Sequence, residues 1–399
     1  MRTRPNQNPQ QPAPIPRRNR IVGAAAAPVI CEAAAVPLHW IYDREQLNRA
    51  LAACPGDDPA FGPPACPYYR VGPGENGCYG DQAMATLRFL AAQNSRDFDA
   101  AGFGRFLAEA FGPGSRYGNT SARATDLYHA DRPVDARLRG RERTTGHAEW
   151  PVDGPWLHAG LRTFLHNYRQ NTSCPTGDPS DDQADGAVKA GAMAARYADQ
   201  PPEFLEIQVD AAVRVTQDNA LASAAARFLA LVCHRQISEA RPRLADSVIR
   251  TCEIFEHDSS GRLPRPGRRK TAEKSVARAV RAALAQLSAP DAAASEDGHA
   301  RVVSELGDDC HEPGNTAAAL HGALEAENSR QRGQIPAPDG ILPWAVRRDI
   351  RAGGCNCSRV AQIAALLGAT HGNHTLPPQW CRKARNGNDA LALASRLTG

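Results

Sequence analysis

The chain has 399 residues, of which 42% are hydrophobic and 23% are charged, so it holds enough apolar material for a sizeable core. This composition excludes an intrinsically disordered protein and a small disulfide-stapled scaffold. The net charge of +4 is too small to indicate a nucleic-acid partner. The eleven cysteines are odd in number and follow no tight framework, which favours reduced thiols and a cytoplasmic location.

The N-terminal part of the sequence predicts neither a membrane span nor a secretory signal. Residues 1–20 carry five arginines, five prolines and no acidic residue, and we expect a disordered arm there. An organelle transit peptide is the alternative, but such segments are rich in serine and this one has none. The most apolar stretch, Ile21 to Leu38, contains Glu32 and two prolines, so we expect no membrane partner.

From residue 21 onward, apolar side chains recur every three or four residues, whereas alternating strand patterns are scarce. The sequence therefore predicts an all-α fold. The predicted helices are Ala83–Ala92, Phe103–Phe111, Trp156–Phe164, Ala187–Tyr197, Leu221–Val232, Val276–Leu287 and Val360–Leu367.

A basic and low-complexity insertion is predicted near residues 257–300. Basic side chains from Arg262 to Lys274 alternate with prolines and glycine, which is typical of a solvated loop, although a polyanion site is the alternative. Residues 288–300 contain no large apolar side chain and predict a surface linker.

The first candidate functional segment is an apolar helix that contains one carboxylate. Glu32 lies in an alanine-rich run and is followed by His39, Trp40 and Asp43. A charge in such a run is costly unless it is paired or faces a polar site. Glu32 is therefore either a functional residue or a salt-bridged surface residue.

The second segment, Pro73 to Met84, is a glycine-rich loop that leads into a helix with Asp81 near its first turn. Aspartate is a common N-cap, and capping is the simplest explanation. A helix start also presents backbone N–H groups that can receive a phosphate or a carboxylate.

The third segment has three carboxylates in five positions, Asp181, Asp182 and Asp185, before an apolar helix. Acids this close repel one another unless they are solvated or share a cation, and hard divalent ions prefer such oxygen ligands. A solvated acidic loop is the alternative.

The fourth segment, Ala352 to Arg359, opens another helix and contains Cys355 and Cys357. A zinc site would be one interpretation, but the spacing is Cys-x-Cys and no second pair matches it.

These four segments, in this order, resemble the ADP-ribosylglycohydrolase family, and within it the branch of selenoprotein J and the J-type crystallins of cnidarian lenses. The resemblance spans about residues 21–390. The segments that carry it are Ala33–Asp43, Tyr79–Ala83, Asp181–Gly186 and Ala352–Arg359, with Arg214–Gln217, Pro313–Gly314 and Ala319–His321 in support.

The resemblance implies a single large orthogonal helical domain, residues 21–399, whose cleft lies between loops at helix starts. It implies two Mg²⁺ ions that hold the ribose of an ADP-ribosyl group on a small molecule or a protein. Such hydrolysis cleaves a glycosidic bond with the help of a carboxylate. The residues assigned to the cleft are Asp81 and Asp182 as catalytic groups, Glu32, His39, Gln183 and Asp185 as substrate-binding groups, and Asp81 and Ser358 as metal ligands.

The sequence departs from the family pattern at the metal ligands. Cys355 and Cys357 stand where the family has aspartates, and His39 stands where it has a glutamate. Our first hypothesis is an ADP-ribosylglycohydrolase-like hydrolase that cleaves a glycosidic or ester bond. The alternative is a catalytically inactive, crystallin-like structural or ligand-binding protein, and a redox role for the two cysteines is a third option.

Overall fold

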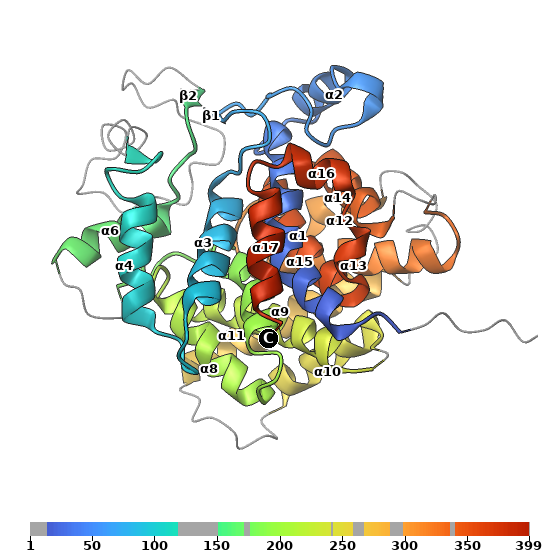
Figure 1. Ribbon diagram of the computed structural model, residues 1–399. Helices are drawn as coiled ribbons and strands as arrows, with labels where there is room; N and C mark the ends of the chain where they lie inside the picture. The colour runs from blue at the N-terminus through green and yellow to red at the C-terminus, as the bar shows by residue number, and fades with distance from the viewer. Residues whose placement is uncertain are drawn as a thin grey trace, which may run out of the picture.

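The computed structural model describes residues 14–118, 151–170, 176–240, 242–257, 267–287, 298–335 and 340–398. Helices form almost all of the regular structure in this part of the chain (Figure 1), which confirms the predicted all-α class. The two short strands that the described residues contain, β1 (Tyr69–Arg70) and β2 (Val152–Asp153), pair in parallel.

The centre of the fold is the crossing of α1 (Arg17–Ala35) and α15 (Asn356–His371), two helices that are almost wholly buried. The backbones touch because glycine occupies both sides of the crossing. A Cβ atom added to Gly23 would lie 2.3 Å from the carbonyl oxygen of Gly368. Figure 1 shows α17 (Gly387–Arg396) beside α1.

Helix α1 and the short helix η1 that follows it are apolar and long enough, by length and hydropathy, to cross a membrane. Packing explains this composition, because 94% of the apolar stretch is buried inside the molecule. Helices surround it on several sides, and its alanines let them approach closely.

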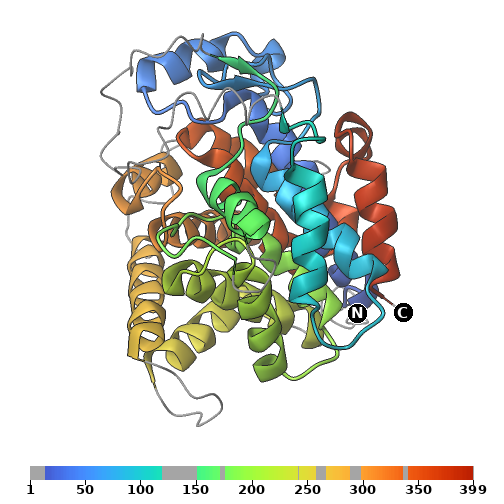
Figure 2. The same ribbon diagram turned by 90° about the vertical axis from the view of Figure 1, so that its left-hand side faces the viewer.

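The remaining helices form a shell around this pair and share one hydrophobic core with it. The shell helices in contact with the pair are α3 (Cys78–Ala92), α7 (Ala190–Arg196), α9 (Ala220–Ser238), α13 (Gly314–Gln331), α14 (Ile341–Ala352) and α16 (Pro378–Lys383). Figure 2 brings two outer helices, α4 (Ala100–Phe111) and α6 (Ala159–Gln170), to the front of the molecule. The outer elements are α2 (Arg44–Ala52), α4 (Ala100–Phe111), α6 (Ala159–Gln170), α8 (Pro202–Arg214), α10 (Leu244–Glu256), α11 (Gly267–Leu287) and α12 (Gly298–Leu306), and the 3₁₀ turns are η1 (Val36–Leu38), η2 (Pro55–Asp57), η3 (Ala187–Lys189) and η4 (Asn373–Thr375).

Each predicted helix is present, and most extend beyond the predicted bounds. Two do not: α6 begins at Ala159 rather than at Trp156, and the predicted helix Ala187–Tyr197 divides into the 3₁₀ turn η3 and α7, which ends at Arg196. The chain just before α6 is extended, because β2 and Gly154 pair with the β1 segment.

Two predicted boundaries need correction. The first helix begins at Arg17, inside the segment expected to be a disordered arm, and Arg20 anchors it by donating to the carbonyl oxygens of Gln236 and Glu239. Residues 1–13 lie outside the described residues. The second correction concerns the expected basic loop.

The basic loop becomes helical from residue 267 onward, because α11 packs against α9, α10 and α13. Arg269 lies 3.3 Å from a carboxylate oxygen of Asp210, so one of its basic side chains is paired. Similarly, α12 begins at Gly298, inside the expected linker. Residues 258–266 and 288–297 of the expected insertion lie outside the described part of the chain.

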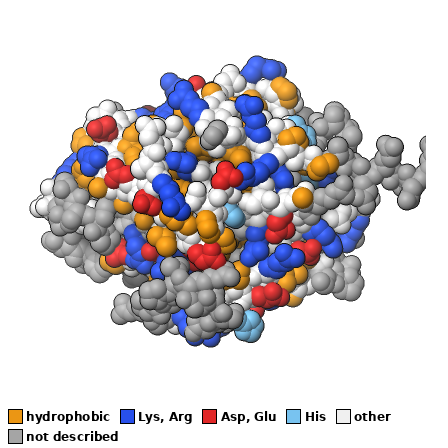
Figure 3. Space-filling view, turned by 60° about the horizontal axis from the view of Figure 1, so that its bottom comes forward, with side chains coloured by type: hydrophobic (Ala, Val, Ile, Leu, Met, Phe, Trp, Pro, Cys, Tyr) orange, Lys and Arg blue, Asp and Glu red, His pale blue; other side chains and the backbone are white. Residues whose placement is uncertain are grey.

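On the face of the molecule in Figure 3, basic, acidic and apolar side chains are interspersed. This mixture agrees with the small net charge of the sequence.

Candidate functional site

The site is built where the end of η1 meets the start of α15. The Trp40 N–H donates to the Gly354 carbonyl oxygen, and the Gly354 N–H donates to the Ile41 carbonyl oxygen, both at 2.9 Å. This backbone pairing places His39 Nε2 3.5 Å from the sulfur of Cys355. Two residues that are 316 positions apart in sequence therefore form one polar contact.

A third segment joins them because residue 354 is glycine. Gly354 has a φ of +62°, and a Cβ atom there would lie 2.3 Å from the Asp308 carbonyl oxygen. The close approach lets the Cys355 N–H donate to that oxygen at 2.7 Å. The same segment carries Cys310, and the neighbouring Cys355 and burial raise the pKa of its thiol well above the usual range.

Cys355 is fully buried, yet polar groups surround its sulfur. The Ser358 hydroxyl lies 3.2 Å away and the Tyr79 hydroxyl 3.5 Å away, and both can donate. Burial alone would raise the pKa of Cys355, but the neighbouring Cys310, His39 and Ser358 side chains outweigh it and hold the pKa well below its usual range.

Glu32 is wholly buried, which excludes the surface salt bridge considered above. The Asn76 amide donates to Oε2 at 2.8 Å, and the Gly77 N–H lies 3.1 and 3.2 Å from the two carboxylate oxygens. Glycine at position 80 is required, because a Cβ atom there would lie 2.2 Å from Oε2. Burial, with a smaller contribution from the charge of Asp81, raises the pKa of Glu32 to about 7 despite these donors.

Replacing Glu32 with glutamine is expected to remove part of the pH dependence of stability. The folded pKa of about 7 exceeds the ordinary value of 4.5, so the folded protein binds more protons in this interval and the wild type loses stability as pH rises through it. Urea unfolding of both proteins at several pH values gives the difference between their free energies of unfolding. Between about pH 5 and about pH 7, the wild type should become less stable relative to the glutamine variant as the pH rises. A constant difference across the interval contradicts the prediction.

Asp81 is not the N-cap of α3, because Gly77 holds that position and the Asp81 N–H already donates to its carbonyl oxygen. The Tyr117 hydroxyl donates to Oδ2 of Asp81 at 2.6 Å, and the Arg116 guanidinium lies 3.7 Å from the same oxygen. Burial raises the pKa of Asp81 to about 6, although Arg116 and Tyr117 oppose this shift.

Asp185 is buried beside the first turns of α3, where it contacts Gln82. His158 Nδ1 lies 2.7 Å from its Oδ1, and the Gln82 amide donates to the same oxygen. Burial alone would lower the pKa of His158, but the charge of Asp185 holds that pKa well above its usual range. The same partner lowers the pKa of Asp185 against the effect of burial. The two side chains form a buried ion pair.

Lys189 is buried next to this pair. Its ammonium group donates to the Asp185 carbonyl oxygen at 2.7 Å and contacts the Gln82 and Thr216 side chains at 3.4 and 3.3 Å. Burial lowers the pKa of Lys189 to about 8, although Asp185 opposes the shift. Lys189 adds a positive group to the centre of the site.

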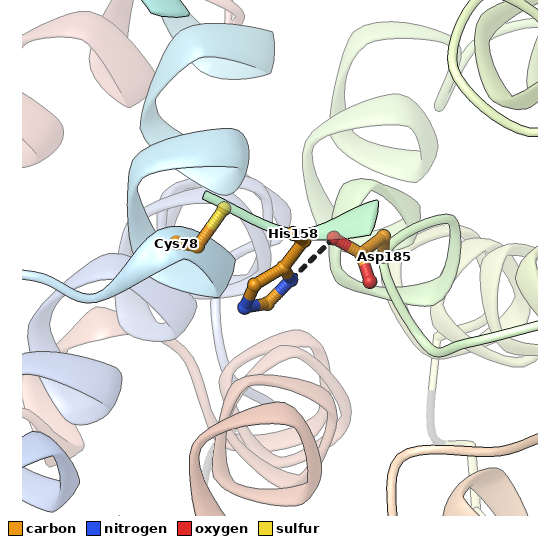
Figure 4. Close-up of side chains that lie close together, drawn as sticks. All are labelled: Cys78, His158 and Asp185. Atoms are coloured by element: carbon orange, nitrogen blue, oxygen red, sulfur yellow. Dashed lines mark hydrogen bonds and ion pairs between the residues drawn. The ribbon is translucent and has the colours of Figure 1, made fainter. Parts of the chain in front are cut away.

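Two groups in the described part of the chain bring three possible metal-ligand atoms within 4.8 Å of one another: Cys78, His158 and Asp185, and His299, His321 and Glu325. Figure 4 shows the first group, with Asp185 bonded to one ring nitrogen of His158 and the Cys78 sulfur near the ring. Its sulfur, nitrogen and oxygen donors suit a softer ion than magnesium.

The acidic loop does not place its three carboxylates together. Asp181 is buried, and its Oδ2 has no hydrogen-bond partner among the described residues. Burial raises the pKa of Asp181 to about 7, and Asp185 adds to the shift. Asp182, the residue expected to be catalytic, is 34% exposed, and its Oδ1 lies 2.6 Å from His311 Nδ1.

Gln183 contributes its backbone to the acidic loop. Its N–H donates to Asp181 Oδ1 at 3.1 Å, and its carbonyl oxygen accepts from the Gln217 amide at 2.8 Å. The Gln183 backbone also bridges His311. Gln183 therefore joins the acidic loop to residues 308–312, and its side chain has no hydrogen bond to any residue in the described part of the chain.

The donor set does not fit the two Mg²⁺ ions that the resemblance implies. The Ser358 hydroxyl lies 2.9 Å from the carbonyl oxygen of Cys355 and 3.2 Å from its sulfur, either of which its proton can reach, and it accepts from the Asn315 amide at 2.8 Å. Asp81 is next to the cation of Arg116, and it belongs to neither group of possible metal ligands. Magnesium requires about six oxygens in octahedral order, whereas sulfur lies beside Ser358.

The zinc interpretation of Cys355 and Cys357 also fails, because the two thiols have different surroundings. Cys357 is close to Glu32 and Cys66, and burial raises its pKa well above its usual range. Neither cysteine belongs to a group of possible metal ligands among the described residues.

Sequence reasoning missed three members of the site: His158, Lys189 and Cys310. Lys189 had a usable signal, because lysine is rare in this chain and this one lies in an apolar run. His158 and Cys310 are on loops, where no periodic pattern distinguishes a site residue from a solvated one.

Comparisons with known proteins agree with this architecture. A solved structure described as an ADP-ribosylglycohydrolase-related protein complex matches with a TM-score of 0.56 at 17% identity, over 96% of this chain and 97% of the other. Crystallin J1A of Tripedalia cystophora is 24% identical, over 96% of this chain and 97% of its own length. Crystallin J1B of the same organism is 22% identical, over 95% and 96%. The family model for ADP-ribosylglycohydrolase matches residues 13–399, and the chain therefore belongs to the ADP-ribosylglycohydrolase family.

Proposed function

We propose that this protein binds a compound bearing an ADP-ribosyl group and does not catalyse its magnesium-dependent hydrolysis. The proposal rests on one observation: both expected metal ligands already contact other side chains of the protein. Asp81 is next to Arg116 and Tyr117, and Ser358 is held between Asn315 and Cys355. A cation at either place would have to displace these partners.

The ligand-binding part of the proposal rests on the polar groups that flank a surface pocket. A pocket of about 420 Å³ is lined by residues of the segment Ser304–Gly314, and Asp182 contacts its His311. Deeper in the fold, the unpartnered oxygens of Asp181 and Asp185 can accept hydrogen bonds from ribose hydroxyls.

Binding is tested by calorimetry with ADP-ribose, with and without EDTA. We expect saturable binding that EDTA leaves unchanged, and about tenfold weaker binding for Asp182→Ala, because a charge-assisted hydrogen bond is lost. Glu45→Ala, on the exposed surface of α2, is the matched control and should bind like the wild type. The absence of saturable binding contradicts this part of the proposal.

Hydrolysis is tested separately with ADP-ribosyl-arginine and ADP-ribosylated protein in the presence of magnesium. We expect the same background release from the wild type and from Asp81→Ala. The rival hydrolase hypothesis has its own support, because a carboxyl group with a pKa near 7, such as that of Glu32 or Asp181, suits general acid–base catalysis. Magnesium-dependent release that is lost in Asp81→Ala would establish the hydrolase instead.

A further inference from the structure

Two histidines and a glutamate from α12 and α13 lie together outside the candidate site. His299 belongs to α12, whereas His321 and Glu325 belong to α13, where a spacing of four residues places both on one face of the helix. One possible metal-ligand atom of each residue lies within 4.8 Å of the other two, and all three side chains are buried. Neither the acidic loop nor the proposed ligand uses these residues.

His299 is held in the orientation of a metal-binding histidine. Its Nε2 lies 2.9 Å from Oδ1 of Asp349, and because a carboxylate can only accept, Nε2 is the donor. In a neutral ring, this contact leaves the lone pair on Nδ1, the nitrogen that faces His321. A carboxylate that accepts from the second nitrogen in this way fixes the tautomer and the direction of a ligating imidazole.

His321 has hydrogen bonds that are incomplete in the protein alone. Its side chain is 2% exposed, and its Nε2 has no hydrogen-bond partner among the described residues. A neutral imidazole has one N–H and one lone pair, so an N–H bond from Nδ1 to His299 leaves a buried lone pair unused at Nε2. With the lone pair on Nδ1 instead, two lone pairs face each other across 3.1 Å, and a cation between them removes their repulsion. Zinc binds imidazole nitrogen at about 2.0–2.1 Å, so it fits between nitrogens at this separation.

Glu325 adds an oxygen to the two nitrogens. Its Oε2 lies 4.0 Å from Nδ1 of His299, and a small rotation of the side chain brings it closer. Arg348 donates to Oε1 at 2.7 Å and to Oε2 at 3.3 Å. The shorter bond can remain on Oε1 while Oε2 turns to a metal, and ligating carboxylates are commonly hydrogen-bonded in this manner.

The charges around the cluster indicate which kind of ion it suits. Arg348 balances Glu325, and Arg359 lies 2.9 Å from Asp349, so the cluster has little net negative charge to attract a cation. Magnesium and calcium need six or more oxygens, which this cluster lacks. Affinity must therefore come from imidazole nitrogen, which suits zinc and the neighbouring transition metals.

We propose that His299, His321 and Glu325 form a structural zinc site that ties α12 to α13. Two histidines and one glutamate are an established set of zinc ligands, and water occupies the fourth position. Helix α12 is nine residues long, and a helix this short is marginal by itself in water. The ion stabilises it by a bond to α13, and the last residues of α12 line the surface pocket.

The test is zinc binding by the full-length protein after treatment with EDTA and removal of the chelator. Competition with a chromophoric zinc chelator at pH 7 gives the affinity and the number of ions per chain. We expect His321→Gln to bind one zinc ion fewer than the wild type, or to bind it at least about 100-fold more weakly, since a lost ligand costs more than a lost outer partner. His234→Gln, a change at a buried histidine of α9 that contacts the Gln200 carbonyl oxygen, is the matched control and should bind like the wild type.

X-ray absorption spectroscopy of the wild type with one equivalent of zinc identifies the ligands even if a variant fails to fold. We expect nitrogen and oxygen at about 2.0–2.1 Å and no sulfur at about 2.3 Å. A sulfur ligand would place the ion at Cys78 and overturn the proposal. It is also overturned if the wild type binds no zinc, if His321→Gln binds zinc like the wild type, or if an equal concentration of magnesium displaces the ion. These readouts need no ADP-ribosyl compound, so their outcome is independent of the proposed function.

Discussion

Replacing Asp185 with asparagine is expected to lower the free energy of unfolding by about 3 kcal/mol, because breaking a buried ion pair leaves its partner charge uncompensated. The substitution keeps the shape of the side chain but removes the negative charge that faces His158. Both side chains of the pair are almost wholly buried, so water cannot replace the lost partner. The nearby ammonium group of Lys189 loses the same counter-charge.

Urea unfolding at pH 7, followed by circular dichroism, measures the loss. Asp182→Asn is the matched control, because Asp182 also pairs with a histidine but is one-third exposed, and its change should cost less than about 1 kcal/mol. A second readout is the pKa of His158, which should fall in the Asp185 variant and can be followed by NMR. Equal losses in the two variants, or an unchanged pKa of His158, would contradict the buried ion pair.

Replacing Arg359 with methionine is expected to cost about 3–5 kcal/mol, again because a buried charge loses its partner. The guanidinium is fully buried and lies 2.9 Å from Asp349 Oδ1. It also donates to the carbonyl oxygens of Gly353 at 2.5 Å and Asp308 at 3.3 Å. The substitution leaves one carboxylate and two carbonyl groups without this donor.

Arg359 also links two loops of the site, since Gly353 precedes α15 and Asp308 lies in the loop that lines the pocket. The matched control is Arg49→Met on the surface of α2, where the side chain is 73% exposed and its pair with Glu45 spans 3.9 Å. That change should alter the free energy of unfolding by less than about 0.5 kcal/mol. Thermal and urea unfolding of both variants give the comparison, and a loss of the same size in both sinks the prediction.

The buried polar residues of the candidate site form two groups with different chemical properties. The acids on one side, Asp181 and Asp185, have oxygen atoms without partners and can accept hydrogen bonds from a ligand. On the other side, His39, Tyr79 and Ser358 surround the sulfur of Cys355 and can stabilise negative charge on it.

The amino-acid sequence by itself determined the class of the fold and the positions of its helices. Helical periodicity is local, because side chains three or four positions apart share one face, so the core of each predicted helix was found. The ends of the helices could not be predicted in this way. Helix α1 begins at Arg17, and its Arg20 donates to the carbonyl oxygens of Gln236 in α9 and of Glu239 just after α9, which no local pattern reveals. The family also followed from the sequence, because its motifs are short and contiguous.

Only the tertiary structure decided how the motifs meet. It placed Asp181, rather than the more exposed Asp182, in the interior, and it paired Asp185 with His158. It also brought His39 to Cys355, across 316 positions. The physical reason is that loops have no periodic pattern, and their side chains are positioned by long-range backbone hydrogen bonds and by glycines, such as Gly354, that permit close approach.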